Sequence, residues 1–145
     1  MPTAKPPFRA DHVGSLLRTP ALKDARAKFA KGEIKQADLT AIEDREIDAL
    51  IKKQEAAGLQ SVTDGEFRRS WWHLDFLWGL DGVEKLDMGE GVAFAGMKTR
   101  AEGVQITGKI GFTSHPHVGH FKYLAARTKA TAKVTIPAPS AIYGR

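Results

Sequence analysis

The stretch Ser61-Val62-Thr63-Asp64-Gly65-Glu66-Phe67-Arg68-Arg69 decides the fold of this chain. It opens with small and β-branched residues, as buried parallel strands do, and then becomes polar at a glycine flanked by two acidic residues. In β/α enzymes a strand that ends in this way presents carboxylates to a ligand. The earlier stretch Phe8–Ser15 has the same character, with polar groups around Gly14. These two strand ends, separated by about fifty residues of mostly helical sequence, predict a β/α enzyme scaffold.

The sequence between the two strand ends predicts two helices. The first begins at Thr19-Pro20, because threonine can cap a helix and proline suits its first position, and Gly32 ends it. The second runs from about Lys35 to Ala57, where apolar residues recur on one face, and a glycine ends it as well. A short strand at Leu59–Thr63 follows.

Beyond the polar turn, the apolar pattern changes from helical to alternating and back. The elements expected there are a helix at Arg69–Trp78, hairpin strands at Val92–Phe94 and Gly103–Ile110, a helix at Val118–Arg127 and a strand at Lys133–Ile136. Strands that alternate with helices indicate a parallel β/α architecture. Three parallel strands cannot close a barrel, because a complete (β/α)8 barrel needs about 250 residues.

Composition restricts the class of protein. The 145 residues are 42% hydrophobic and 27% charged, which are values typical of one globular domain. The sequence has no apolar run long enough for a transmembrane helix, and its proline-rich start at residues 1–7 reads as a flexible lead-in, not a signal peptide. There is no cysteine, so the chain can form neither disulfides nor thiolate metal sites. We therefore expect a cytoplasmic protein that does not enter a membrane.

Charge is distributed unevenly along the chain, whose formal net charge is +5. Residues 98–145 contain eight basic residues and one acidic residue, whereas residues 64–97 contain seven acidic and three basic ones. The basic residues are scattered singly, without an arginine-rich run, so they predict a solvated face and not a nucleic-acid site. Acidic surface that balances this charge could also lie on sequence outside the chain.

Several motifs, met in order from about Phe8 to Ser140, closely resemble the cobalamin-independent methionine synthase family, and most closely its short bacterial members with a single barrel. The motifs are Ala10-Asp11-His12-Val13-Gly14-Ser15-Leu16-Leu17-Arg18, Gln54-Glu55-x-x-Gly58-Leu59, Val62-Thr63-Asp64-Gly65-Glu66-Phe67-Arg68-Arg69 and Ile136-Pro137-Ala138-Pro139-Ser140.

The resemblance implies the α/β fold of a TIM (β/α)8 barrel, of which this chain would form roughly the first three βα units. Residues 8–145 would be the amino-terminal portion, with a β-hairpin insertion at about 83–110. The implied reaction transfers a methyl group from a methylated folate, or from methylcobalamin, to the zinc-activated thiol of homocysteine.

In the family, a Gly-Ser turn after the first strand and a glutamate after the second hold the amino-acid part of homocysteine. Those positions match Gly14, Ser15 and Glu66 here. The chemistry is consistent, because an ammonium group needs a carboxylate partner, while a substrate carboxylate suits backbone N–H groups and a hydroxyl at a turn.

This sequence departs from the family at the zinc site. The family's ligands, a histidine, a glutamate and two cysteines, come from later strands, so we expect zinc to be held outside this chain and none to be bound by the chain alone. A homocysteine thiol without zinc stays mostly protonated near pH 7. The isolated chain is therefore expected to be inactive or nearly so, and to bind homocysteine weakly or not at all.

Further candidates have two interpretations each. His12 is either a polar contact to substrate or a structural residue whose hydrogen bonds are satisfied within the fold. Asp64 either contacts substrate or accepts hydrogen bonds from its own turn. Trp71 and Trp72 either stack on the flat ring of a folate donor or belong to a core. Arg68, with its neighbour Arg69, meets the carboxylate tail of the donor or forms ion pairs with acidic helix faces.

The motif His115-Pro116-His117-x-x-His120 invites a metal interpretation. Proline breaks the helical spacing, however, and no acidic residue lies nearby in the sequence. A polar loop that leads into a helix is the favoured interpretation, so no metal ligand is predicted in this chain.

Two rival functions remain open at this point. One is an alkyl-to-thiol transferase of the epoxyalkane:coenzyme M type, which shares the zinc-thiolate chemistry but should not need the amine-binding Glu66. The other is a truncated, non-catalytic remnant or assembly module, because a partial barrel exposes strand edges and apolar faces that favour self-association. Gel filtration distinguishes the remnant or assembly module from the other functions, because a clean monomer that melts cooperatively would argue against it.

Overall fold

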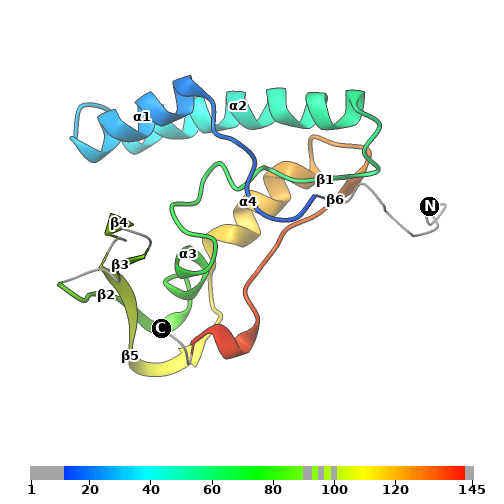
Figure 1. The fold of residues 1–145 in the computed structure, drawn as a ribbon. Helices are drawn as coiled ribbons and strands as arrows, with labels where there is room; N and C mark the ends of the chain where they lie inside the picture. The colour runs from blue at the N-terminus through cyan, green and yellow to red at the C-terminus, as the bar shows by residue number, and fades with distance from the viewer. Residues whose placement is uncertain (1–11, 90–92, 95–96, 99–100, 143–145) are drawn as a thin grey trace. The chain divides into compact units, whose positions relative to one another are not determined.

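The computed structural model describes residues 12–89, 93–94, 97–98 and 101–142 (Figure 1). They divide into two compact units. The first combines the described residues up to Arg69 with Gly119–Thr135, and the second combines Ser70–Val118 with the described residues from Ile136 onward. The predicted lead-in at residues 1–7 and the start of the first predicted strand lie outside the described residues.

Two helices, α1 (Pro20–Ala30) and α2 (Gln36–Ala56), lie side by side in the first unit (Figure 1). The Thr19 hydroxyl accepts a hydrogen bond from the backbone N–H of Leu22 at 3.2 Å, so the predicted cap and start of α1 are confirmed. The second predicted helix is confirmed to within a residue at each end. Its buried residues recur every three or four positions, at Leu39, Glu43, Ile47, Ile51 and Gln54.

A parallel strand pair follows, formed by β1 (Ser61–Val62) and β6 (Thr131–Ala132). Backbone hydrogen bonds extend the pairing at both ends, from Thr131 N–H to the Gln60 carbonyl (3.0 Å) and from Lys133 N–H to the Val62 carbonyl (2.9 Å). The expected strand at Lys133–Ile136 was therefore placed too late. The chain leaves the ladder after Lys133 because the Thr135 carbonyl accepts from the Arg69 side chain instead of from a strand.

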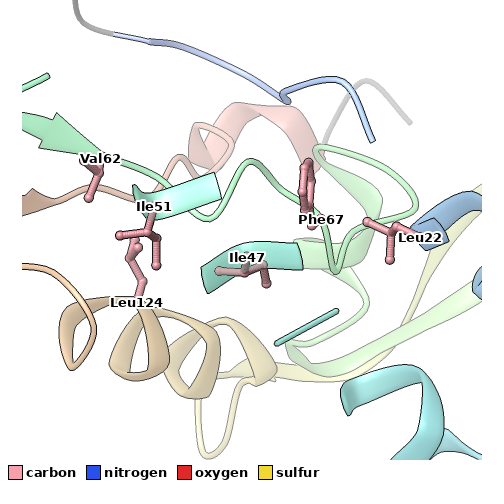
Figure 2. Packing of buried hydrophobic residues seen from close by; sticks show 6 residues of the cluster. All are labelled: Leu22, Ile47, Ile51, Val62, Phe67 and Leu124. Atoms are coloured by element: carbon pink, nitrogen blue, oxygen red, sulfur yellow. The ribbon is translucent and has the colours of Figure 1, made fainter. Parts of the chain in front are cut away.

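The core of the first unit gathers one side chain or more from each of α1, α2, β1, the polar turn and the helix α4 (Pro116–Ala125) (Figure 2). Its members are Leu22, Ile47, Ile51, Val62, Phe67 and Leu124, each no more than 2% exposed. Helix α4 begins two residues before the predicted start, at a proline that suits the first helical position. Because Phe67 directly follows the polar turn, its burial ties that turn to the core.

In the second unit, β2 (Asp81–Asp87) pairs antiparallel with β5 (Glu102–Gly111), and the short strands β3 (Ala93–Phe94) and β4 (Met97–Lys98) pair antiparallel within the intervening segment. A 3₁₀ turn at Pro139–Ile142 closes the described chain. The core consists of Leu74, Leu77, Val83 and Val104. That these strands form an insertion in a barrel stays a prediction.

The helix expected at Arg69–Trp78 is much shorter, because α3 spans Leu74–Leu77. Its carboxylate Asp75 accepts hydrogen bonds from the backbone N–H groups of Ser70 (2.6 Å) and Trp71 (3.1 Å). These bonds hold the preceding residues in a turn, so a side chain satisfies donors that a longer helix would have satisfied with carbonyls.

The described residues thus form an α/β structure with one parallel strand pair, while the three βα units of a partial barrel stay a prediction. None of the described helices combines the length and the apolar character that a membrane span requires.

Candidate functional site

The polar turn after β1 is built by its own side chains. Gln54 on α2 fixes the strand end, since its amide accepts from Thr63 N–H at 3.0 Å and donates to the Thr63 carbonyl at 2.8 Å. The Thr63 hydroxyl then accepts from Gly65 N–H (3.0 Å), and an Asp64 carboxylate oxygen accepts from Glu66 N–H (2.9 Å). The turn-bonding alternative for Asp64 is therefore seen directly, while a substrate contact stays a prediction.

Glu66 has a strained backbone and a buried side chain. Its φ is +57°, the one positive value at a non-glycine residue in the described part of the chain, and its side chain is 7% exposed. Its Oε1 accepts from the Thr135 hydroxyl at 2.8 Å and from Arg69 Nη1 at 3.4 Å. Among the described residues, no hydrogen bond reaches Oε2. One carboxylate oxygen is thus held by two donors, while the other has no donor among the described residues.

The amino-terminal segment approaches the same turn. Leu16 N–H donates to the Gly65 carbonyl at 3.1 Å, so the preceding Ser15, which is exposed, lies close to the turn. Gly14 adopts φ +87°, a value that favours glycine. Arg18 Nη2 donates to the backbone carbonyls of Glu66 (3.0 Å) and Arg69 (2.6 Å). The segment that carries Gly14 and Ser15 is therefore held against the turn that carries Glu66, while their joint role in an amino-acid site stays a prediction.

His12 lies in the same amino-terminal segment. The Lys133 ammonium donates to the His12 carbonyl, which ties the amino-terminal segment to the end of β6. The His12 Nε2 atom is buried and has no hydrogen-bond partner among the described residues. A buried polar atom without a partner is uncommon, because its burial costs free energy.

These side chains lie beyond the carboxyl ends of two neighbouring parallel strands, the place where ligands bind in α/β proteins. They combine the buried Glu66 carboxylate with the exposed Ser15 and the cationic Arg18 and Arg69. Such a set can bind a zwitterionic amino acid, with the carboxylate facing the ammonium.

Comparison with known proteins decides the family. Residues 8–137 match the family described as cobalamin-independent synthase, catalytic domain. The chain belongs to the cobalamin-independent methionine synthase family. It is 52% identical over 140 residues to the uncharacterized protein YxjH of Bacillus subtilis, an alignment that covers 96% of this chain and 37% of that protein. The chain thus spans little more than a third of this relative.

Solved structures agree with this family. A candidate vitamin-B12-independent methionine synthase from Listeria monocytogenes aligns with a TM-score of 0.76 at 47% identity, over 94% of this chain and 38% of the other. A B12-independent methionine synthase from Shewanella sp. W3-18-1 aligns with a TM-score of 0.58 at 19% identity, over 77% of this chain and 32% of the other, which is a likeness of fold. The α/β fold is thus that of methionine synthase structures.

Arg68, a candidate donor contact in this methionine synthase family member, lies in an ion-pair cluster. Its guanidinium pairs with Glu43 at 3.3 Å and with Asp44, and it lies over the ring of Tyr123, 4.8 Å from the ring centroid. The side chain is 7% exposed. This arrangement favours the ion-pair alternative for Arg68, and the donor contact stays a prediction that the geometry does not support.

Two groups of this cluster have shifted pKa values. Burial raises the pKa of the Glu43 carboxyl above its ordinary value, and the guanidinium groups of Arg26 and Arg68 offset this only in part. Burial and the hydrogen bond to Asp48 raise the pKa of Tyr123 to about 12. Both shifts follow from packing within the first unit and indicate a structural role.

The aromatic candidates belong to the second unit. Trp71 Nε1–H donates to a Glu102 carboxylate oxygen at 2.5 Å. Trp72 is 54% exposed, and its ring lies 4.4 Å from that of His73. A stacking contact with a folate donor stays a prediction for both tryptophans.

The first two histidines of the motif, His115 and His117, also belong to the second unit, whereas His120 belongs to the first. His115 is 4% exposed, its Nε2 forms a hydrogen bond with the Phe76 carbonyl (2.9 Å), and its ring stacks on Phe112. Its Nδ1 accepts from His117 N–H at 3.1 Å. Within the described ranges, no three histidine or carboxylate side chains are placed to hold a metal ion.

Sequence reasoning missed Thr135, Arg18 and Lys133. Thr135 fell within an expected strand, where an outward hydroxyl carries no functional signal. Arg18 stood in the quoted family motif but was not singled out. The one available signal was the position of Thr135 just after a strand that runs parallel to β1.

Proposed function

We propose that this chain supplies the amino-acid-binding half of a methionine-synthase-type methyltransferase. The reaction transfers a methyl group from a methylated folate, or from methylcobalamin, to the zinc-activated thiol of homocysteine. The observation that carries the proposal is the Glu66 carboxylate, which is buried and receives two donors at Oε1, while no hydrogen bond from a described residue reaches Oε2. Family membership and the likeness to methionine synthase structures support the reaction type. The same likeness supports a TIM barrel, of which this chain would form the amino-terminal part.

The roles of the residues follow from their chemistry. The open oxygen of Glu66 would accept from the substrate ammonium, a charge-assisted hydrogen bond that favours an amino acid over a simple thiol. The α-carboxylate would meet the turn at Gly14 and Ser15, whose hydroxyl is exposed. This requirement for an amine separates homocysteine from thiols that lack one.

Zinc, when bound in the complete enzyme, would lower the pKa of the acceptor thiol. This chain does not fit the expected ligand set, because it has no cysteine and because no three metal-ligating side chains converge among its described residues. No step of the reaction is therefore assigned to a metal held by these residues. The chain's own contribution is to bind and orient the amino-acid end of the acceptor.

Binding by the 145-residue chain tests the proposal. NMR titration compares L-homocysteine with 4-mercaptobutanoate, which differs only by the missing α-amino group. The expected result is weak binding of homocysteine and a preference over the deaminated analogue of about 10-fold or more, since a hydrogen bond to a charged group contributes about 1.5–3 kcal/mol. The Glu66→Gln variant should lose most of this preference and still bind the analogue as before.

The matched control is Glu33→Gln, which makes the same chemical change at an exposed carboxylate. It should leave the preference unaltered. Equal binding of both ligands by the wild-type chain would refute the proposed amine site.

A further inference from the structure

Thr135 connects the Glu66 carboxylate to the neighbouring strand. Its hydroxyl donates to Glu66 Oε1 at 2.8 Å, and its carbonyl accepts from Arg69 Nη2 at 2.7 Å. Arg69 Nη1 also approaches Glu66 Oε1, at 3.4 Å. The three residues therefore form a closed ring of hydrogen bonds, in which the threonine makes the shorter contact with the carboxylate.

The strand register explains why Thr135 reaches this position. Ser61 is paired with Thr131 and Val62 with Ala132, so the chain beyond β1 and the chain beyond β6 emerge at the same edge of the sheet. Glu66 is four residues beyond the end of β1, and Thr135 is three residues beyond the end of β6. A contact between residues 69 positions apart is thus fixed by two short parallel strands.

We propose that Thr135 is a positioning residue, which orients the Glu66 carboxylate so that Oε2 faces the substrate ammonium; this inference rests on the proposed function. A glutamate side chain has three rotatable torsions, and binding is weaker when the ligand itself must fix them. Because both donors act on Oε1, the carboxylate is held at one oxygen before any ligand arrives.

Thr135 also restrains Arg69, which competes with a ligand for the Glu66 carboxylate. Arg69 is a cation, and without a second acceptor its guanidinium could rotate to form a bidentate pair with the carboxylate. The Thr135 carbonyl holds Nη2 away, and the hydroxyl occupies Oε1. The carboxylate therefore keeps one oxygen for the ligand and is not fully neutralised by its own arginine.

The experiment compares hydroxyl-free variants by their ligand preference. In Thr135→Val, the preference for L-homocysteine over 4-mercaptobutanoate should fall about 3- to 10-fold, the range expected from losing one hydrogen bond to a charged acceptor. Affinity for 4-mercaptobutanoate should not change, because that ligand has no ammonium. Thr135→Ala should repeat the loss, and Thr135→Ser should restore the preference because it returns the hydroxyl.

Thr131→Val is the matched control, since Thr131 is exposed on the same strand segment. It should behave as wild type, and thermal melting confirms that each variant is folded. A wild-type preference that persists in both Thr135→Val and Thr135→Ala overturns this inference and leaves the amine site at Glu66 standing. A Thr135→Ser variant that fails to recover also overturns it. Absence of any preference in the wild-type chain overturns the proposed function itself.

Discussion

Glu43 lies between two arginines in the first unit, and its removal should destabilise the chain strongly. Its two carboxylate oxygens contact Arg26 at 3.2 Å and Arg68 at 3.3 Å, and its side chain is 6% exposed. Removing one partner of a buried ion pair costs about 3–5 kcal/mol, because the other charge is left without compensation. Each arginine keeps a second acceptor here, the Phe67 carbonyl or Asp44, so the lower part of the range applies. Glu43→Ala should therefore lower the free energy of unfolding by about 3 kcal/mol.

Urea unfolding followed by circular dichroism measures this loss, and thermal melting should show a fall of about 10 °C in Tm. The control is Asp24→Ala, which removes one partner of the exposed pair between Asp24 and Lys28. Exposed pairs contribute little, so the control should change Tm barely at all. If Glu43→Ala were no less stable than the control, the cluster would not depend on this carboxylate.

The pH dependence of the Glu43→Gln variant tests the same reasoning by its sign. Burial raises the pKa of Glu43 above the ordinary value of 4.5. Between the ordinary pKa, which applies to the unfolded chain, and the raised pKa of the folded chain, the folded chain binds more protons than the unfolded chain. The free energy of unfolding therefore falls as the pH rises through that interval. Glutamine does not titrate. The stability of the wild type relative to Glu43→Gln should therefore decline as the pH rises from about 4, and a relative stability that grows with pH would refute the reasoning.

Two further substitutions test the turn after β1 by thermal and urea unfolding. Gln54→Leu should lower the free energy of unfolding by about 2–3 kcal/mol, because it leaves the buried N–H and C=O of Thr63 without their partners. The control Gln36→Leu, at an exposed position, should change it by no more than about 0.5 kcal/mol. Similar losses in the two variants would contradict this reasoning. Gly65→Ala should destabilise by about 2 kcal/mol or more, since its φ is +66° and an added Cβ would lie 2.5 Å from a leucine side chain of α2. Gly58→Ala, with φ +82° in open space, should lose less, and an equal loss would show that crowding is unimportant.

The sequence predicted those elements whose structure depends on residues close together in the chain. A capping threonine before Pro20 and a glycine after the second helix placed α1 and α2 closely, because these signals act within a few residues. The short strand predicted at Leu59–Thr63 contains β1 for the same reason. The helix predicted from Arg69 failed, because the apolar period did not reveal that the Asp75 carboxylate would bind the preceding N–H groups.

Contacts between distant segments were not readable in the same way. The pattern could not give the register of β1 against β6, and the strand predicted at Lys133–Ile136 was placed two residues late. Thr135 was consequently assigned to a strand and its hydroxyl had no partner to suggest a role. The family resemblance named Glu66, but the contact of its carboxylate with Thr135 follows only from the parallel pairing.

Glu66 has a strained backbone conformation, and the contacts around the residue explain why it persists. A left-handed φ at a residue with a long side chain persists only where surrounding contacts fix it. Here Asp64 holds the amide, Arg18 holds the carbonyl, and Thr135 with Arg69 holds the carboxylate. A glycine would adopt the same backbone without strain but would offer no carboxylate. The contacts around Glu66 therefore offset the strain of its backbone, and they keep a buried carboxylate just beyond the strand end, as the proposed site for an ammonium group requires.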